Sequence, residues 1–259
     1  MYRFKAIIFD VDGTLADTER DGHRLAFNAA FAEAGLAWHW DVARYGALLA
    51  VTGGKERIRY YIEQEGIVLE SAVNLDAFIA ALHSAKTRHY LALLETGAIP
   101  LRRGVLRLLR EARAAGIRLA IATTTTPENV IELLRHCGEP GLPDWFEVIA
   151  AGDVVPRKKP APDIFTLALA QLGLDARDCV AVEDSDNGVS AALAAGLKAL
   201  LVTLNAYTAN QSFDAAPLVV ESLGGPDEPA VVRRGDLGGS NYVDLAALDR
   251  LHATVYNAT

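Results

Sequence analysis

The sequence has few cysteines, no long hydrophobic run and no excess of positive charge. Its two cysteines, Cys137 and Cys179, cannot build a disulfide framework and do not show the spacing of zinc ligands. No apolar run reaches the roughly 18 uncharged residues that a membrane-spanning helix needs, so we expect none. A formal net charge of −8 argues against a general basic surface for nucleic acid or anionic lipid.

The start of the chain and its composition indicate a folded enzyme-sized protein. Residues 1–5 lead directly into a short apolar strand, so we expect no signal peptide and a cytoplasmic protein. The 259 residues are 51% hydrophobic, which suffices for one large domain or two modest ones.

Short apolar runs that alternate with helical patterns predict an α/β fold. The runs predicted as buried parallel strands span residues 6–9, 117–122, 146–150, 180–182 and 199–203. The helices predicted among the later strands span 105–115, a segment that begins at Pro127, 162–172 and 189–195. Regular alternation of this kind predicts a three-layer, Rossmann-like core with a parallel sheet.

A long interval after the first strand breaks this alternation. Residues 17–97 contain helical patterns and no predicted strand. We therefore predict a helical cap domain at 17–97, inserted into a core made of residues 1–16 and 98–259. Near the end, residues 224–240 are rich in Gly, Pro and charge and predict a surface loop, followed by a helix at 242–251.

Acidic residues follow two of the predicted strands. Ligands of open parallel sheets bind beyond the carboxyl ends of the strands, where Asp10, Asp12, Glu183 and Asp184 are expected. Carboxylates this close repel unless a cation or a proton joins them, and Mg²⁺ prefers such oxygen ligands. The alternative is an ordinary Asp-Gly turn beside a helix cap.

Two further positions suit a phosphate group. Thr123 ends a strand and precedes a helix N-terminus, where hydroxyl and backbone N–H groups favour anions. Lys159 could reach the same anion and neutralise the acidic cluster. The alternatives are a simple helix cap for the threonine and a solvated loop for the lysine.

These motifs resemble those of the haloacid dehalogenase superfamily, in the same order and at suitable spacing. The motifs are Asp10-Val11-Asp12-Gly13-Thr14, Thr123, Lys159-Pro160 and Glu183-Asp184-Ser185. The inserted helices resemble the small cap of its β-phosphoglucomutase-like branch. The resemblance implies that Asp10 is a nucleophile that forms an aspartyl-phosphate, and that Asp12 is a general acid and then a base. It also implies phosphoryl contacts from Thr123 and Lys159, and Mg²⁺ bound by Asp10, the Asp12 backbone carbonyl, Glu183 and Asp184.

The predicted cap carries a second possible anion site. Two glycines before a helix expose N–H groups in Thr52-Gly53-Gly54-Lys55-Glu56-Arg57, and two cations follow them. His83 and Lys86 share one helix face, His23 lies a turn beyond Glu19, and Arg102 is predicted to face the site from the second domain connection. Each residue alone would be an ordinary surface group.

The cap also resembles that of the CbbY-type phosphatases. This resemblance rests on Glu19, His23, Ala26-Phe27-Asn28, Tyr45, residues 52–57, Ala85-Lys86-Thr87 and residues 122–125. It implies hydrolysis of xylulose-1,5-bisphosphate, an inhibitor of Rubisco, to xylulose 5-phosphate. Glu19 would bind sugar hydroxyls, and Lys55 and Arg57 the distal phosphate. The full set of predicted substrate contacts is Glu19, His23, Tyr45, Thr52, Gly53, Gly54, Lys55, Arg57, His83, Lys86, Arg102, Thr124, Thr125 and Asn129.

Three other functions remain open at this stage. A β-phosphoglucomutase would need the same core but would return the phosphate to the sugar. A phosphoglycolate or other small-ester phosphatase would share the chemistry and differ in the cap. A non-catalytic phosphate- or metal-binding module would use Asp10 only as a switch. In each catalytic case we expect a monomer that binds a small phosphorylated sugar and Mg²⁺, with no nucleic acid or membrane partner.

Overall fold

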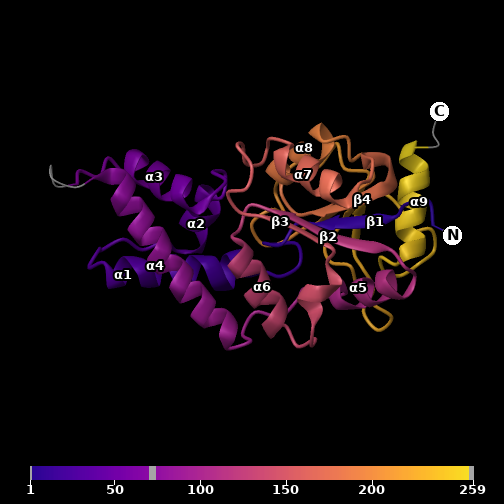
Figure 1. Cartoon of the computed structure of the whole chain (residues 1–259), viewed down its shortest axis with the longest axis horizontal. Coiled ribbons are helices and arrows are strands. Elements are labelled where there is room, and N and C mark those ends of the chain that lie inside the picture. Colours follow the sequence, from indigo (N-terminus) through magenta and orange to yellow (C-terminus); the bar gives the residue numbers. More distant parts are fainter. Residues whose placement is uncertain (1, 70–73, 257–259) are drawn as a thin grey trace.

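The computed structural model describes residues 2–69 and 74–256. Within them, seven strands form one sheet in the order β3-β2-β1-β4-β5-β6-β7 (Figure 1). The strands are β1 (Ala6–Phe9), β2 (Arg118–Thr123), β3 (Val148–Ala151), β4 (Cys179–Glu183), β5 (Leu200–Thr203), β6 (Leu218–Val220) and β7 (Val232–Arg234). All neighbouring strands are parallel except β6 and β7. The remaining residues lie outside this description: Met1 and 257–259 of the predicted core, and 70–73 of the predicted cap.

Helices cover both faces of the sheet, which confirms the three-layer α/β prediction (Figure 1). Ile7 and Phe9 of β1 pack in one hydrophobic cluster with α5 (Val105–Ala114), α6 (Pro127–His136) and α9 (Leu245–Tyr256). Ala6 and Ile8 point to the opposite face and pack with α7 (Asp163–Leu172) and α8 (Asp186–Ala194). Side chains alternate along a strand, so a strand buried on both faces is apolar throughout.

The helices between β1 and α5 have a hydrophobic cluster of their own. They are η1 (Glu19–His23), α1 (Arg24–Glu33), α2 (Val42–Leu48), α3 (Gly54–Gln64) and α4 (Leu75–Glu95), and the cluster is formed by α1 to α4. Trp40 lies at the centre, with its ring 4.7 Å from Phe27, 4.8 Å from Phe31 and 5.3 Å from Tyr61. These helices lie beyond one end of the sheet in Figure 1. The division into a core (1–16 and 98–259) and a cap (17–97) stays a prediction.

The two chain crossings between sheet and helices run side by side. Ala16 and Leu101 form an antiparallel bridge, and the Arg102 backbone N–H donates to the Leu15 carbonyl at 2.8 Å. The helical segment is therefore attached through one short, hydrogen-bonded ribbon beside the end of β1.

The structure corrects three local predictions. Residues 224–240 are not only a loop, because β7 lies within them as an exposed edge strand paired with β6. Helix α8 begins at Asp186 rather than 189, because Ser185 caps it by accepting from the Gly188 N–H. The last helix is α9, which starts and ends later than residues 242–251. The sequence patterns also missed β6, α2 and the 3₁₀ turns η2 (Leu142–Trp145) and η3 (Ala176–Asp178).

Candidate active site

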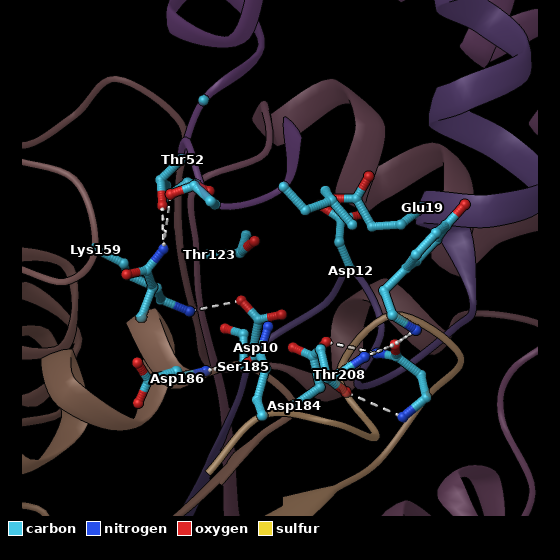
Figure 2. A pocket seen from close by; sticks show the side chains of 18 of the residues that line it. Asp10, Asp12, Glu19, Thr52, Thr123, Lys159, Asp184, Ser185, Asp186 and Thr208 are labelled. Atoms are coloured by element: carbon cyan, nitrogen blue, oxygen red, sulfur yellow. Dashed lines mark hydrogen bonds and ion pairs between the residues drawn. The ribbon is translucent and has the colours of Figure 1, made fainter. Parts of the chain in front are cut away.

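A cavity of about 400 Å³ opens at the carboxyl ends of β1, β2 and β4 (Figure 2). Parallel strands end at the same edge, so residues that follow different strands converge there. The predicted site residues that line this cavity are Asp10, Asp12, Glu19, Thr52, Gly53, Arg57, Thr123, Thr124, Lys159 and Asp184.

Lys159 joins two of the strand-end carboxylates. Its buried Nζ donates to Asp10 Oδ1 at 2.6 Å, to Glu183 Oε1 at 2.5 Å and to the Ala122 carbonyl at 2.9 Å. Glu183 Oε2 accepts from the Asp184 N–H at 3.0 Å, so both oxygens of this fully buried group have partners. The lysine therefore partly compensates two carboxylates that would otherwise repel one another.

Burial dominates the ionisation of this cluster. It raises the pKa of the Asp10 carboxyl to about 8, although Lys159 opposes the shift; nearby Glu183 and Asp12 add to it. Burial, and then the charges of Asp10 and Glu183, hold the pKa of Asp184 well above its usual range. For Lys159, attraction to the two carboxylates outweighs burial and raises its pKa. The cluster thus favours a bound proton or an additional cation.

The donor atoms fit a divalent metal ion. Asp10, Glu183 and Asp184 each offer a carboxylate oxygen, and these atoms lie within 4.8 Å of one another. Hard divalent cations such as Mg²⁺ prefer this all-oxygen set. The Asp12 side chain is outside the group, so it is the Asp12 carbonyl that stays a predicted ligand. Gly13 allows close packing here, because a Cβ at its φ of +89° would lie 2.3 Å from Asp184 Oδ2.

The Asp12 carboxylate turns toward η1 and α4. Its Oδ1 accepts from Thr18 Oγ1 at 2.6 Å and lies 3.0 Å from His23 Nε2. His23 Nδ1 lies 2.8 Å from Lys86 Nζ, whose ammonium group can only donate. The imidazole proton therefore belongs on Nε2, facing Asp12. Lys86 itself lies over the rings of Phe27 and Tyr90.

Asp12 has the opposite electrostatics to Asp10. Burial raises the pKa of its carboxyl, but attraction to His23, hydrogen bonds from His23 and Thr18, and the charge of Lys86 outweigh burial and lower it to about 2. Two carboxyl groups two residues apart are therefore held in different protonation states, which is typical of an acid/base pair with separate roles.

A second, smaller cavity continues from the first between helices α3 and α4 and the N-terminus of α6. It shares Asp12, Glu19, Gly53, Arg57 and Thr124 with the first cavity. The other predicted site residues along it are His23, Gly54, Lys55, His83, Lys86, Thr125 and Asn129. The N-terminal residues of α3 and α6 both line it, and such helix ends attract anions.

Cations surround this second cavity, but His83 is not one of them at neutral pH. Burial, followed by the charges of Lys86 and Lys55, lowers the pKa of His83 to about 4. Lys158, which was not predicted, lines the cavity and pairs with Glu56 at 2.8 Å and Asp153 at 3.0 Å. Asn129 Oδ1 is buried and has no hydrogen-bond partner among the described residues.

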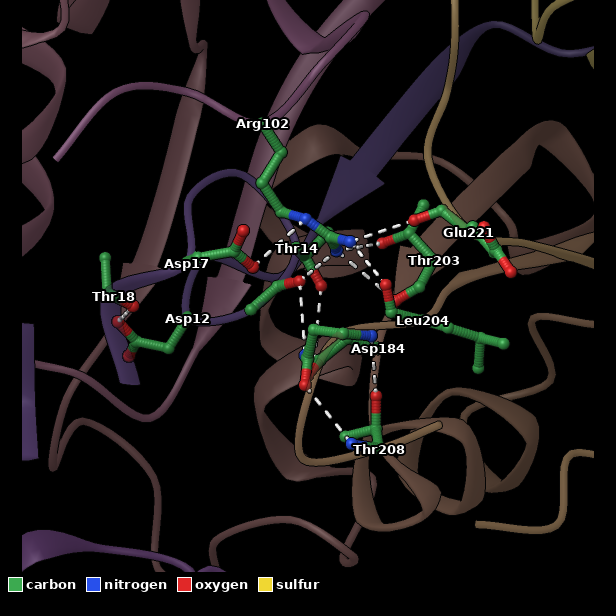
Figure 3. Close-up of polar contacts among 12 residues, drawn as sticks. Asp12, Thr14, Asp17, Thr18, Arg102, Asp184, Thr203, Leu204, Thr208 and Glu221 are labelled. Atoms are coloured by element: carbon green, nitrogen blue, oxygen red, sulfur yellow. Dashed lines mark hydrogen bonds and ion pairs between the residues drawn. The ribbon is translucent and has the colours of Figure 1, made fainter. Parts of the chain in front are cut away.

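Two predicted substrate contacts, Arg102 and Tyr45, are not among the described residues that line either cavity. The Arg102 guanidinium points into the sheet edge, where it pairs with Asp17 at 3.2 Å and donates to Thr203 Oγ1 at 3.0 Å and the Glu221 carbonyl at 3.0 Å (Figure 3). The Tyr45 hydroxyl donates to Glu19 and accepts from Arg57 at 2.9 Å, so it orients two lining residues.

Sequence reasoning missed one wall of the first cavity. It is formed by the loop after β5 and the start of α8, through Asp186, Asn187, Asn205, Tyr207, Thr208, Gln211 and Ser212. Asn205 carried a usable signal, because it is a polar residue just beyond a buried parallel strand. Asn187 also contacts the segment before α3, donating to Thr52 Oγ1 at 3.1 Å.

Comparison with known proteins agrees with this geometry. A family model described as haloacid dehalogenase-like hydrolase matches residues 4–196. The chain belongs to this family. Protein CbbY of Cupriavidus necator (plasmid) is 46% identical over 98% of this chain and 100% of that protein. Protein CbbY of Rhodobacter capsulatus is 48% identical over 85% and 93%.

A solved structure of mutant CbbY from Rhodobacter sphaeroides in complex with xylulose-1,5-bisphosphate is 46% identical, with a TM-score of 0.78. The aligned region covers 86% of the present chain and 98% of the CbbY chain. Hydrolases of this family use a divalent metal, and the buried acidic cluster could hold one. In the part of the chain described here, none of the helices could cross a membrane.

Proposed function

We propose that this protein is a Mg²⁺-dependent phosphatase that hydrolyses xylulose-1,5-bisphosphate to xylulose 5-phosphate, and that residues 17–97 act as the substrate-selecting cap. The observation that supports it most is the junction of two cavities at Asp12. One cavity contains a carboxylate cluster suited to phosphoryl transfer, and the other is lined by cations and two helix N-termini. A sugar with a phosphate at each end matches this pair.

In the first step, an Asp10 oxygen forms a bond to phosphorus while the bond from phosphorus to the sugar oxygen breaks. The departing oxygen takes a proton from Asp12, so free xylulose 5-phosphate leaves and phosphate stays on Asp10. Lys159 donates to Asp10 and can also contact the phosphoryl oxygens. The Thr123 hydroxyl, at the end of β2, can donate to the same group.

In the second step, water attacks the phosphorus of the aspartyl-phosphate and Asp12 accepts the water proton. The Asp10 carboxylate and inorganic phosphate are regenerated. The low pKa of Asp12 keeps it ionised in the resting protein, as a base requires. An anionic phosphate bound beside it favours protonation before the first step.

The metal, held by Asp10, Glu183, Asp184 and the Asp12 carbonyl, would supply positive charge to the phosphoryl oxygens as negative charge spreads over them. Lys159 is positioned by three acceptors, and Asp12 is positioned by Thr18 and His23. These contacts hold both carboxylates in place before the substrate arrives.

Selectivity for a bisphosphate is assigned to the second cavity. Lys55 and Lys158 carry positive charge there, and the N-terminal residues of α3 and α6 offer backbone N–H groups. Glu19 lies where both cavities meet and suits a sugar hydroxyl. The identity of the sugar rests on the relatives, since a homologue at 46% identity is described in complex with xylulose-1,5-bisphosphate.

A substrate panel tests the proposal. Phosphate release from xylulose-1,5-bisphosphate, other sugar bisphosphates, sugar monophosphates and phosphoglycolate should show the highest kcat/KM with the first. Lys55→Ala should lower kcat/KM for the bisphosphate at least tenfold and leave simple monophosphates within about twofold, since one charged contact is lost.

Arg59→Ala is the matched control. Arg59 lies on the same helix and pairs with Asp76, outside both cavities. It should leave the preference unchanged. Equal loss on mono- and bisphosphates in Lys55→Ala would contradict the assignment of the second cavity. Conversion of glucose 1-phosphate to glucose 6-phosphate without phosphate release would instead identify a mutase.

A further inference from the structure

Asn205, at the end of β5, contacts a predicted metal ligand from a position that neither the sequence motifs nor the comparisons assign. Its Nδ2 donates to Asp184 Oδ2 at 2.6 Å. The same nitrogen lies 3.5 Å from the Gly13 carbonyl, in the loop that follows Asp10. We propose that Asn205 is a positioning residue that holds the Asp184 carboxylate in the orientation needed to bind the metal.

Asp184 has few other donors. Lys159 donates to Asp10 and Glu183. Among the described residues, the other side-chain donor to Asp184 is Thr14 Oγ1, at a longer distance of 3.4 Å. The amide of Asn205 is neutral, so it can fix the carboxylate without adding a competing positive charge at the metal position. Partners of this kind fix the direction of a metal-binding oxygen.

The orientation of the Asn205 amide is itself determined. Its Oδ1 accepts from the Tyr207 N–H at 2.9 Å and the Thr208 N–H at 3.2 Å. Two backbone donors require an oxygen at that end of the amide, so the NH₂ group must face Asp184. The Asn205 N–H in turn donates to Thr208 Oγ1 at 3.1 Å, which closes the turn. Figure 3 shows Asp184 and Thr208 near one another below Arg102.

The turn is braced against the cap helices. The Tyr207 ring lies 5.9 Å from the ring of Tyr45, edge to face. Gly46 makes room for it, because a Cβ there would lie 2.9 Å from the Tyr207 ring. Helix α2 thus supports the turn through Tyr207, which favours one fixed geometry for the Asn205 amide.

The inference rests on the proposed metal site, so it is tested by metal binding to the resting enzyme rather than by activity. Isothermal titration with Mg²⁺ at pH 8 should give a Kd for Asn205→Ala about 10- to 100-fold above the wild type. Asn28→Ala is the matched control. The Asn28 side chain also bonds two backbone groups, the N–H and the carbonyl of Trp40, but it lies in α1. Asn28→Ala should therefore leave the Kd for Mg²⁺ within about twofold of the wild type.

Asn205→Ser gives a second test if the alanine variant does not fold. A serine oxygen can still accept from the turn but cannot reach Asp184, so the same loss of affinity is expected. A Kd within twofold of the wild type in either variant would overturn the inference while leaving the metal site intact. A wild type without saturable Mg²⁺ binding would overturn the metal site as well.

Discussion

Metal affinity should rise steeply with pH, because the carboxylate cluster must lose a proton when a cation binds. Burial, opposed by Lys159 and aided by Glu183 and Asp12, raises the pKa of Asp10 to about 8 in the metal-free protein. Metal ligands bind as ionised carboxylates, so binding must displace this proton. A carboxyl of that pKa is about 1% ionised at pH 6 and half ionised at pH 8.

The expected increase in Mg²⁺ affinity is therefore about 50-fold between pH 6 and pH 8 for Asp10 alone. The raised pKa of Asp184 acts in the same direction and can only steepen the change. The raised pKa of Asp10 also makes the unfolding free energy of the metal-free protein depend on pH. The native state of the metal-free protein binds more protons than the unfolded chain between about pH 4 and 8, so its unfolding free energy falls as pH rises through that range.

Isothermal titration at pH 6, 7 and 8 measures this prediction. Repeating the titration at pH 7 in two buffers of different ionisation enthalpy should show release of at least about one proton per metal bound. Asp10→Asn removes the titrating group and should reduce the pH dependence. A Kd that is the same at pH 6 and pH 8, with no proton released, would refute the electrostatic account of the cluster.

Two substitutions test the cations around the carboxylates. Lys159→Met should lower the unfolding free energy of the metal-free protein by about 3–5 kcal/mol at pH 8, because a buried ion pair is broken, and by less at pH 6, where Asp10 binds a proton. Urea unfolding measures both values, and a loss below about 1 kcal/mol at pH 8 contradicts the pairing. His23→Gln should raise the pKa of Asp12 and move the acidic limb of the kcat/KM profile to higher pH, whereas His89→Gln, which loses only an exposed contact, should not. An unmoved limb in His23→Gln would show that the histidine does not control Asp12.

The central site could be predicted because its residues follow buried strands. Asp10, Thr123 and Glu183 each end or follow an apolar run, and parallel topology brings such ends together. The same rule applied to β5 would have found Asn205, whose role depends on a contact with a residue distant in sequence.

Other features could not be predicted from local patterns. The charge of Arg102 suggested a substrate contact, but five carbonyl and hydroxyl oxygens at the sheet edge accept its hydrogen bonds. Strand β7 was hidden because its side chains are exposed and Gly and Pro surround it, so no apolar run marks it. The role of Tyr45 depends on Glu19 and Arg57, from other helices. Each case is decided by tertiary contacts rather than by sequence spacing.

The most direct test of the proposed chemistry is phosphate release from xylulose-1,5-bisphosphate by the wild type and by Asp10→Asn, with Mg²⁺ at pH 8. An amide at this position cannot act as the attacking carboxylate, while the cavity around it is otherwise retained. The wild type should release one phosphate per sugar, and Asp10→Asn should release none above the enzyme-free rate. Release at the wild-type rate by Asp10→Asn would contradict the proposed chemistry.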